Sequence, residues 1–213
     1  MISFGCCIAS EEKFARHAAP GLTLSAEPDS QVVETSHATS ILEAYNEILD
    51  HYSGNDDLEA LVLLHEDTEI RDPAFCRKVR MAFRDPSVGI LGVIGAQEVT
   101  GLRWWDGSGK GRVGESRGRI DFGPGESDVD AVDGLLLVLS PWVVANHRFD
   151  TGSFAGFHAY DVDICFAVRA AGKRVRTLDV DVFHATKGGY GDQAAFAQSD
   201  AVFRRKWNLS SGG

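Results

Sequence analysis

The sequence predicts an α/β protein with one domain, in which helices cover both faces of a mostly parallel central sheet. Three observations lead to this prediction. Short apolar runs alternate with helical segments along the first half of the chain. Those runs are rich in β-branched residues and uninterrupted, as expected for strands buried on both faces. The length of 213 residues and the 44% of apolar residues fit one packed domain, and no repeat or linker divides the chain.

Composition narrows the function classes. The chain has 21 Lys and Arg against 31 Asp and Glu, a net charge of −10, so we expect no nucleic-acid partner. A nucleotide ligand stays open, because one metal ion can reverse the local field. No basic leader and no run of about 18 apolar residues is present, so we expect no integral membrane segment. The four cysteines form no CxxC pair, which favours reduced thiols and a cytoplasmic location, with an inter-strand bridge as the alternative.

The first half of the chain predicts a repeating strand–helix order. A helix over 11–19, which Pro20 and Gly21 end, follows the first strand, and a helix over 36–53 has apolar residues on one face. A helix over 73–83 begins after Asp72 as cap. The strands that alternate with these helices are predicted over 2–9, 31–34, 58–64 and 88–94. This order indicates right-handed crossovers and therefore parallel strands.

The second half changes in character. Residues 106–125 hold seven glycines among charged residues, so we expect a mobile hairpin or loop that buries no core. It is either an inert surface excursion or a flap over 107–125 that closes on ligand. Beyond it we predict strands over 129–139 and 173–183 and helices over 159–171 and 192–206.

Polar residues follow the clearest strand, 58–64. His65 and Asp67 fall on one side of an extended chain and Glu66 on the other. Ligands of open α/β sheets bind beyond the carboxyl ends of the strands. Mg²⁺ and Mn²⁺ take carboxylate oxygens, and Mn²⁺ also accepts imidazole. The sequence therefore indicates a divalent-cation site, unless the strand merely ends in solvated residues.

A second acidic cluster begins the predicted helix 159–171. Asp161 and Asp163 stand there beside His158 and Tyr160. Capping of the helix explains one of the two carboxylates more easily than both. A functional role for one of them is the alternative.

Two isolated residues complete the candidate site. Asp133 interrupts an apolar strand, which is costly unless it binds a ligand hydroxyl or a backbone group; a bulge allowed by Gly134 is the alternative. His184 is either a surface residue or a ligand, and the glycine-rich segment after it, with Lys187 and Tyr190, suits a phosphate.

Taken together, these segments resemble the family 2-type glycosyltransferases. The similarity is closer to a small bacterial glycosyltransferase-like branch related to a streptomycin-biosynthesis protein. The matching stretches lie in family order and are residues 40–49, 63–68, 90–96, 132–134 and 157–163, followed by His184. The resemblance implies a Rossmann-like GT-A fold in one catalytic domain over 1–213, with a donor half over about 1–100 and an acceptor half over about 101–213.

The resemblance also implies roles for individual residues. Asp67 and His184 would ligate Mn²⁺ or Mg²⁺ on the donor diphosphate, and His65 replaces the first acidic residue of a DxD-like element. Asp161 would be the general base. The remaining expected contacts are Asn46, Glu66 and the 36–40 turn near the nucleotide, and Asp133, Gly134, His158, Tyr160 and Asp163 in the acceptor or sugar pocket. Trp104 and Trp105 either pack in the core or stack on a sugar.

The expected reaction is inverting, metal-dependent transfer of a sugar from a nucleoside diphosphate to an acceptor hydroxyl. UDP is the first choice of donor nucleotide, with GDP and dTDP as alternatives. Two other functions stay open: a non-catalytic nucleotide-sugar-binding module and a nucleotidyltransferase. The latter needs a Gly-rich, basic loop after the first strand, where residues 9–13 read ASEEK. Residues 203–207 lack the QxxRW signature of processive synthases, and the oligomeric state is open, a homodimer included.

Overall fold

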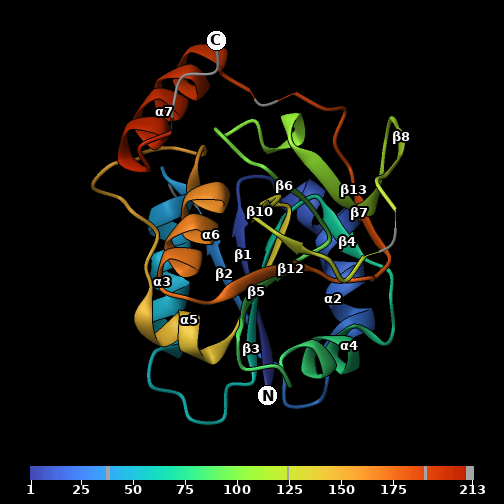
Figure 1. The fold of residues 1–213 in the computed structure, drawn as a ribbon. Helices are drawn as coiled ribbons and strands as arrows, with labels where there is room; N and C mark the ends of the chain where they lie inside the picture. The colour runs from blue at the N-terminus through green and yellow to red at the C-terminus, as the bar shows by residue number, and fades with distance from the viewer. Residues whose placement is uncertain (37–38, 124, 190, 210–213) are drawn as a thin grey trace.

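The computed structural model describes residues 1–36, 39–123, 125–189 and 191–209. Its centre is a seven-stranded sheet with the order β2-β1-β3-β11-β5-β12-β9 (Figure 1). Five of these strands run in one direction, while β11 and β9 are antiparallel to their neighbours. The strands are β1 (Ile2–Ile8), β2 (Val32–Ser36), β3 (Ala60–His65), β5 (Val88–Gly92), β9 (Asp128–Val129), β11 (Leu136–Leu139) and β12 (Arg174–Thr177). The predicted mostly parallel sheet is confirmed.

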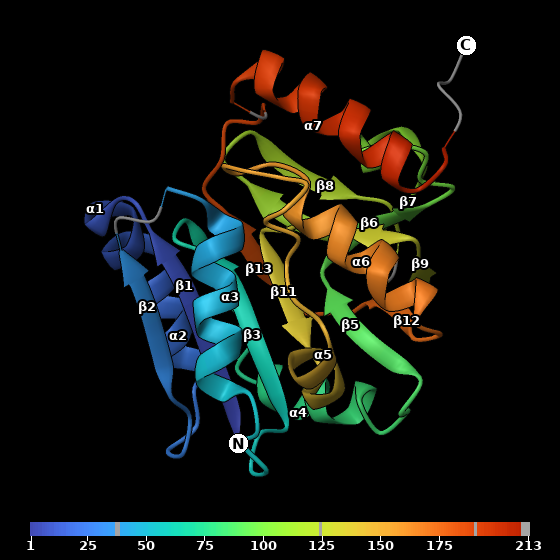
Figure 2. The ribbon, with the colours of Figure 1, turned by 90° about the vertical axis from the view of Figure 1, so that its left-hand side faces the viewer.

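Helices cover both faces of this sheet, as predicted (Figure 2). One face carries α3 (Ile41–Tyr52), α5 (Pro141–Asn146) and α6 (Tyr160–Ala170), and the other carries α2 (Ala19–Ser25) and α4 (Phe75–Ala82). In α3 the apolar residues recur every three or four positions and are buried, from Ile41 to Tyr52. The strand β3 between the layers is fully buried over 60–64, which is why its sequence lacks alternation.

A second, six-stranded sheet lies beside the carboxyl end of β3, with the order β10-β6-β7-β13-β4 and β8 paired to β7. Its strands are β4 (Thr68–Ile70), β6 (Ile94–Gln97), β7 (Ser108–Glu115), β8 (Gly118–Asp121), β10 (Ala131–Val132) and β13 (Val182–His184). The glycine-rich segment is thus a hairpin, as one expectation had it. The expectation that it buries no core is wrong, because β7 pairs with both β6 and β13 and Val113 is buried.

The first helix does not stop at Pro20 and Gly21. The chain continues from α1 (Glu11–Lys13) through a π-helical turn (Phe14–Ala18) into α2. The π turn bonds Ala19 N–H to the Phe14 carbonyl, and Pro20 then occupies the first turn of α2, where its missing N–H costs little. A Cβ on Gly21 would lie 2.5 Å from the Ile70 nitrogen. The glycine therefore allows close packing on β4 rather than ending the helix.

Three predicted strands are broken where the chain changes sheet. The run 88–94 divides into β5 and β6 at Val93, and the run 173–183 divides into β12 and β13. The run 129–139 divides into β9, β10 and β11, with Asp133 and Gly134 between the last two. The terminal helix α7 (Gln193–Lys206) follows the predicted range and is capped by Asp192, which accepts from Ala194 N and Ala195 N.

Two global expectations can be compared with the described residues. None of their helices combines the length and the apolar character that crossing a membrane requires. All four cysteines are free thiols, so the inter-strand bridge is not formed.

Candidate active site

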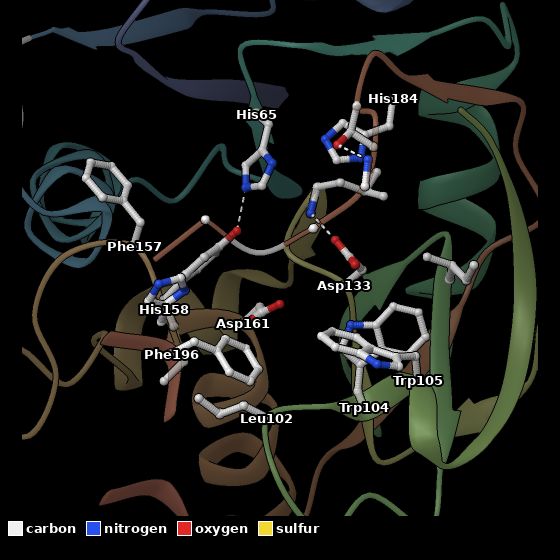
Figure 3. Close-up of a pocket in the computed structure, with 18 of the residues that line it drawn as sticks. His65, Leu102, Trp104, Trp105, Asp133, Phe157, His158, Asp161, His184 and Phe196 are labelled. Atoms are coloured by element: carbon white, nitrogen blue, oxygen red, sulfur yellow. Dashed lines mark hydrogen bonds between the residues drawn. The ribbon is translucent and has the colours of Figure 1, made fainter. Parts of the chain in front are cut away.

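A cavity of about 1140 Å³ opens at the carboxyl end of β3, and residues of both sheets and of α7 line it. Figure 3 shows the predicted residues His65, Asp133, His158, Asp161 and His184 around it. The remaining wall comes from the β7–β8 hairpin, the 3₁₀ turn Trp104–Asp106 and the start of α7. The sequence segments identified as chemical candidates thus converge on one space.

At one end of the cavity, His65, Asp67 and His184 each present a ligand atom within 4.8 Å of the others. His184 Nε2 lies 3.2 Å from Asp67 Oδ1. Strand pairing produces this contact: β13 lies antiparallel to β4 and places His184 opposite Thr68. A carboxylate and two imidazoles make a donor set that suits Mn²⁺ better than Mg²⁺, because Mg²⁺ prefers oxygen ligands.

The ionisation of two members of this cluster, Asp67 and His65, suits a cation. Burial raises the pKa of Asp67, but the hydrogen bond and the charge of His184 outweigh it and hold that pKa well below its usual range. Burial, and then the charge of His184, lower the pKa of His65 to about 4. For His184, burial is outweighed by the hydrogen bond to Asp67, so its pKa is raised. At neutral pH Asp67 is therefore a carboxylate and His65 a neutral imidazole, the forms that bind metals.

The Glu66 carboxylate binds the turn after β1. Its Oε2 accepts hydrogen bonds of 2.6 Å from both Ala9 N and Ser10 N. A nucleotidyltransferase would bind triphosphate at the turn after β1. Here two N–H groups of that turn already donate to the Glu66 carboxylate. Lys13 lies beside it, with Nζ 3.6 Å from both Glu66 and Asp67.

The floor of the cavity holds two carboxylates. Asp161 Oδ2 accepts from Gly134 N at 3.0 Å, and Asp133 Oδ1 accepts from Leu135 N at 2.9 Å. Burial, and then the negative charge of Asp133, raise the pKa of Asp161 to about 7. A carboxyl group with this pKa can accept a proton at neutral pH. Asp133 has the backbone partner that one interpretation of the sequence required.

Tyr160 connects the floor to the histidines. Its hydroxyl lies 2.5 Å from His65 Nε2, which leaves Nδ1 of that ring for another partner. A Cβ on Gly134 would lie 1.9 Å from the Tyr160 hydroxyl oxygen, so only glycine fits there. Ala159, the residue before α6, has a left-handed backbone with φ of 71°, a conformation that costs free energy and is enriched near functional sites.

The structure places two predicted residues elsewhere. Both ends of the Asn46 amide bind the backbone of Phe149, at 2.9 and 2.8 Å, and Asn46 does not line the cavity. The Asp163 carboxylate accepts from Lys206 and Trp207, each at 2.8 Å, and is 4% exposed. The N-cap residue of α6 is Ala159, which makes no side-chain cap hydrogen bond. Tyr190 and part of the 36–40 turn lie outside the described residues.

Sequence reasoning missed several lining residues. Lys13 is a lone lysine in an acidic helix start, and Glu115 and Arg117 lie in the glycine-rich segment. Glu115 lies opposite His184 in the pairing of β7 with β13. No local pattern marks these residues, since only the pairing of short strands brings them to the cavity. Leu102 and Phe196 also line it and read in the sequence as ordinary apolar residues.

Comparisons with known proteins agree with this geometry. Residues 3–188 match the model of a family described as "Glycosyltransferase like family". The streptomycin biosynthesis protein StrF of Streptomyces griseus is 36% identical over 192 residues, which cover 88% of this chain and 68% of StrF.

Solved structures share the fold at low sequence identity. GalNAc-T7, solved with UDP, GalNAc and Mn²⁺, has a TM-score of 0.63 at 10% identity, covering 94% of this chain and 47% of its own. The mannosyltransferase PcManGT of Pyrobaculum calidifontis, solved with GDP-Man and Mn²⁺, has a TM-score of 0.61 at 14% identity, covering 100% of this chain and 65% of its own. At these identities the likeness shows the fold, that of the GT-A glycosyltransferases.

Proposed function

Because this chain belongs to the glycosyltransferase-like family and is a glycosyltransferase of GT-A fold, we propose that it performs inverting, metal-dependent transfer of a sugar from a nucleoside diphosphate to an acceptor hydroxyl. One observation carries the proposal. His65 and His184, which cluster with Asp67, line the same cavity as the carboxylates Asp133 and Asp161. The cytoplasm is the proposed location, because all four thiols are free.

The proposed cofactor is Mn²⁺, with Mg²⁺ as the weaker candidate, held by His65, Asp67 and His184. When bound, such an ion stabilises the negative charge that develops on the leaving diphosphate. The donor is proposed to be a UDP-sugar, and GDP and dTDP donors are the alternatives. The two solved relatives, crystallised with UDP or GDP-Man together with Mn²⁺, support a nucleotide-sugar donor.

The chain's own residues then have defined tasks. Tyr160 holds the ring of His65 through its hydroxyl. The Gly134 N–H holds Oδ2 of Asp161, and Asp161 takes the proton of the attacking acceptor hydroxyl. Asp133, one residue away from Gly134, keeps the pKa of Asp161 raised, so that this carboxylate is a stronger base. Direct attack by the acceptor inverts the anomeric carbon.

The test is a transfer and donor-hydrolysis assay with Mn²⁺ on the wild type and on Asp161→Asn. The amide keeps an acceptor oxygen for Gly134 N–H but cannot take a proton, so we expect kcat to fall about 10²- to 10⁴-fold. Product NMR should show the inverted anomer. Equal turnover of the two proteins would remove Asp161 as the base.

A matched control is available on the same helix. Asp163→Asn changes a carboxylate two residues away that faces α7 rather than the cavity, and should keep kcat per folded molecule. If calorimetry shows nucleotide-sugar binding but neither protein ever forms product, the non-catalytic binding module is the correct function.

A further inference from the structure

The cavity has two chemically different ends (Figure 3). The side chains of His65 and His184 lie at one end, with Asp133 and Asp161 in the middle. Lys13 belongs to the charged end, because its Nζ lies 3.6 Å from Asp67 Oδ2. The opposite end is an aromatic wall, which we define as Leu102, Trp104, Trp105, Ile120, Phe122 and Phe196. The two ends therefore suit different substrates. The nucleoside diphosphate is anionic and belongs at the charged end, which leaves the aromatic end for the acceptor.

Two residues of the aromatic wall, Trp105 and Phe122, are exposed. Six large apolar side chains are exposed among the described residues, and three of them, Trp105, Phe122 and Phe157, line this one cavity. Trp105 is 37% and Phe122 45% exposed. They come from separate segments of the chain, the 3₁₀ turn and the hairpin β7–β8. Convergence of exposed apolar side chains on one concave surface marks a binding site.

The rings of the wall form a continuous surface. Trp105 stacks on Phe196, with ring centroids 6.1 Å apart and an angle of 29° between the planes. Trp104 meets Trp105 edge to face at 5.8 Å. These rings offer faces and edges on which a planar or alkyl group can pack.

Hydrogen-bonding groups are scarce at this end. Among the described lining residues nearest to Phe196, the polar side chains are His158 and Asp192. The Asp192 carboxylate already accepts from Ala194 N and Ala195 N as the cap of α7. A polyhydroxylated ligand body needs several hydrogen-bonding partners when it leaves water, and the side chains of this wall offer two, the indole N–H groups of Trp104 and Trp105.

We propose that the acceptor carries its reacting hydroxyl on an apolar body, an aryl or long alkyl group, which packs on the aromatic wall. The inference rests on the proposed function, because it takes Asp161, between the two ends, as the place where the hydroxyl reacts. It adds the class of acceptor, amphiphilic rather than a free polar sugar.

The experiment measures binding rather than turnover. Phenyl β-glucoside and octyl β-glucoside, the latter below its micelle concentration, are titrated against methyl β-glucoside while tryptophan fluorescence and calorimetric heat are recorded. Each titration is made alone and with UDP and Mn²⁺. The variants are Trp105→Ala and, as a matched control, Met81→Ala, since Met81 is 52% exposed on α4 away from the cavity.

We expect phenyl and octyl glucosides to bind at least about tenfold more tightly than methyl glucoside, because the larger aglycone buries more apolar surface. Trp105→Ala should remove most of this difference and Met81→Ala should leave it. Equal affinities for the three glucosides, no binding of any, or a preference that survives in Trp105→Ala would overturn the inference. These outcomes do not depend on Asp161, so failure of the proposed reaction is seen separately in the turnover assay.

Discussion

Asp161 carries a conflict between stability and reactivity. Its carboxylate lies against Asp133 at the cavity floor, and burial and that neighbouring charge raise its pKa to about 7. A site that only had to fold would place a neutral group there. Keeping two carboxylates together favours a group that takes up a proton, which is what a general base requires.

We therefore expect Asp161→Asn, which lowers activity, to raise the stability of the fold above pH 7. The folded-state pKa is raised, so the contribution of Asp161 to stability is complete below its unfolded pKa and is lost as pH rises through about 7. Asp161→Asn has no charge to bury. Above pH 7 it should therefore be more stable than the wild type, by at most about 4 kcal/mol, and this advantage should vanish near pH 4.

The measurement is urea unfolding of both proteins from pH 4 to pH 8. The enzyme without metal is used, so that ligand binding does not enter the comparison. A variant that is less stable at pH 8 would show that the carboxylate is not destabilised in the fold, and would weaken its assignment as the base.

Among the elements, α7 contacts α6 through the rings of Phe203 and Phe166 and through one buried carboxylate. Asp163 accepts from Lys206 Nζ and Trp207 Nε1, and Lys206 also pairs with Asp150 at 2.7 Å. Asp163→Asn keeps the shape but removes the charge that faces Lys206. We expect a loss of about 1–3 kcal/mol in the free energy of unfolding, with kcat unchanged. A fall in kcat at saturating substrate, without a change in stability, would show that Asp163 acts in the active site.

The β7–β8 hairpin divides into a fixed and a free strand. Strand β7 pairs with β6 and β13. Among the described strands, β8 pairs with β7 alone, and it is mostly exposed. A flap covering all of 107–125 would have to break the second sheet. The segment able to move is therefore the outer strand and its turn, residues 116–123.

Hydrogen exchange tests this division. Amides of β7 should exchange slowly with and without ligand, because residues 108–111 pair with β6 and residues 114–115 pair with β13. Amides of 116–123 should exchange fast in the free protein and slow several-fold with UDP and Mn²⁺. Unchanged exchange in 116–123 on adding both ligands would rule out closure of the hairpin.

Across the whole molecule, long buried elements were predictable and short ones were not. The uninterrupted apolar run of β3 and the amphipathic pattern of α3 are enough to predict both elements, because each pattern shows which faces of the element are buried. The strands of two to four residues in the second sheet carry no such pattern. Their pairing is decided by tertiary contacts, and it is the pairing of β13 with β4 that brings His184 to Asp67.

The candidate site was likewise predictable only in part. Asp67, Asp161 and His184 could be named from residue types and family resemblance. Of these, Asp161 and His184 line one cavity, and Asp67 contacts His184. Asn46 and Asp163 sit in matching motifs, but their side chains turn to Phe149 and to α7. Which way a side chain at a helix start points depends on what packs against the helix, and local sequence does not contain that information.

The two sheets meet at the proposed cation. Asp67 follows β3 of the seven-stranded sheet, and His184 ends β13 of the second sheet. An ion held by both would bind the native protein and not the unfolded chain. At a Mn²⁺ concentration 100-fold above Kd the gain is about 2.7 kcal/mol, which for a chain of this size raises Tm by about 5–10 °C.

Thermal unfolding with Mn²⁺, with Mg²⁺ and with EDTA measures this gain. We expect a larger rise with Mn²⁺ than with Mg²⁺, reversed by EDTA, because two of the three ligands are imidazoles. His184→Ala should abolish the rise, while His51→Ala, at the end of α3 and outside the cavity, should keep it. An equal Mn²⁺ shift in both variants would mean that the ion binds elsewhere, and the coupling of the two sheets through Asp67 and His184 would then rest on their hydrogen bond alone.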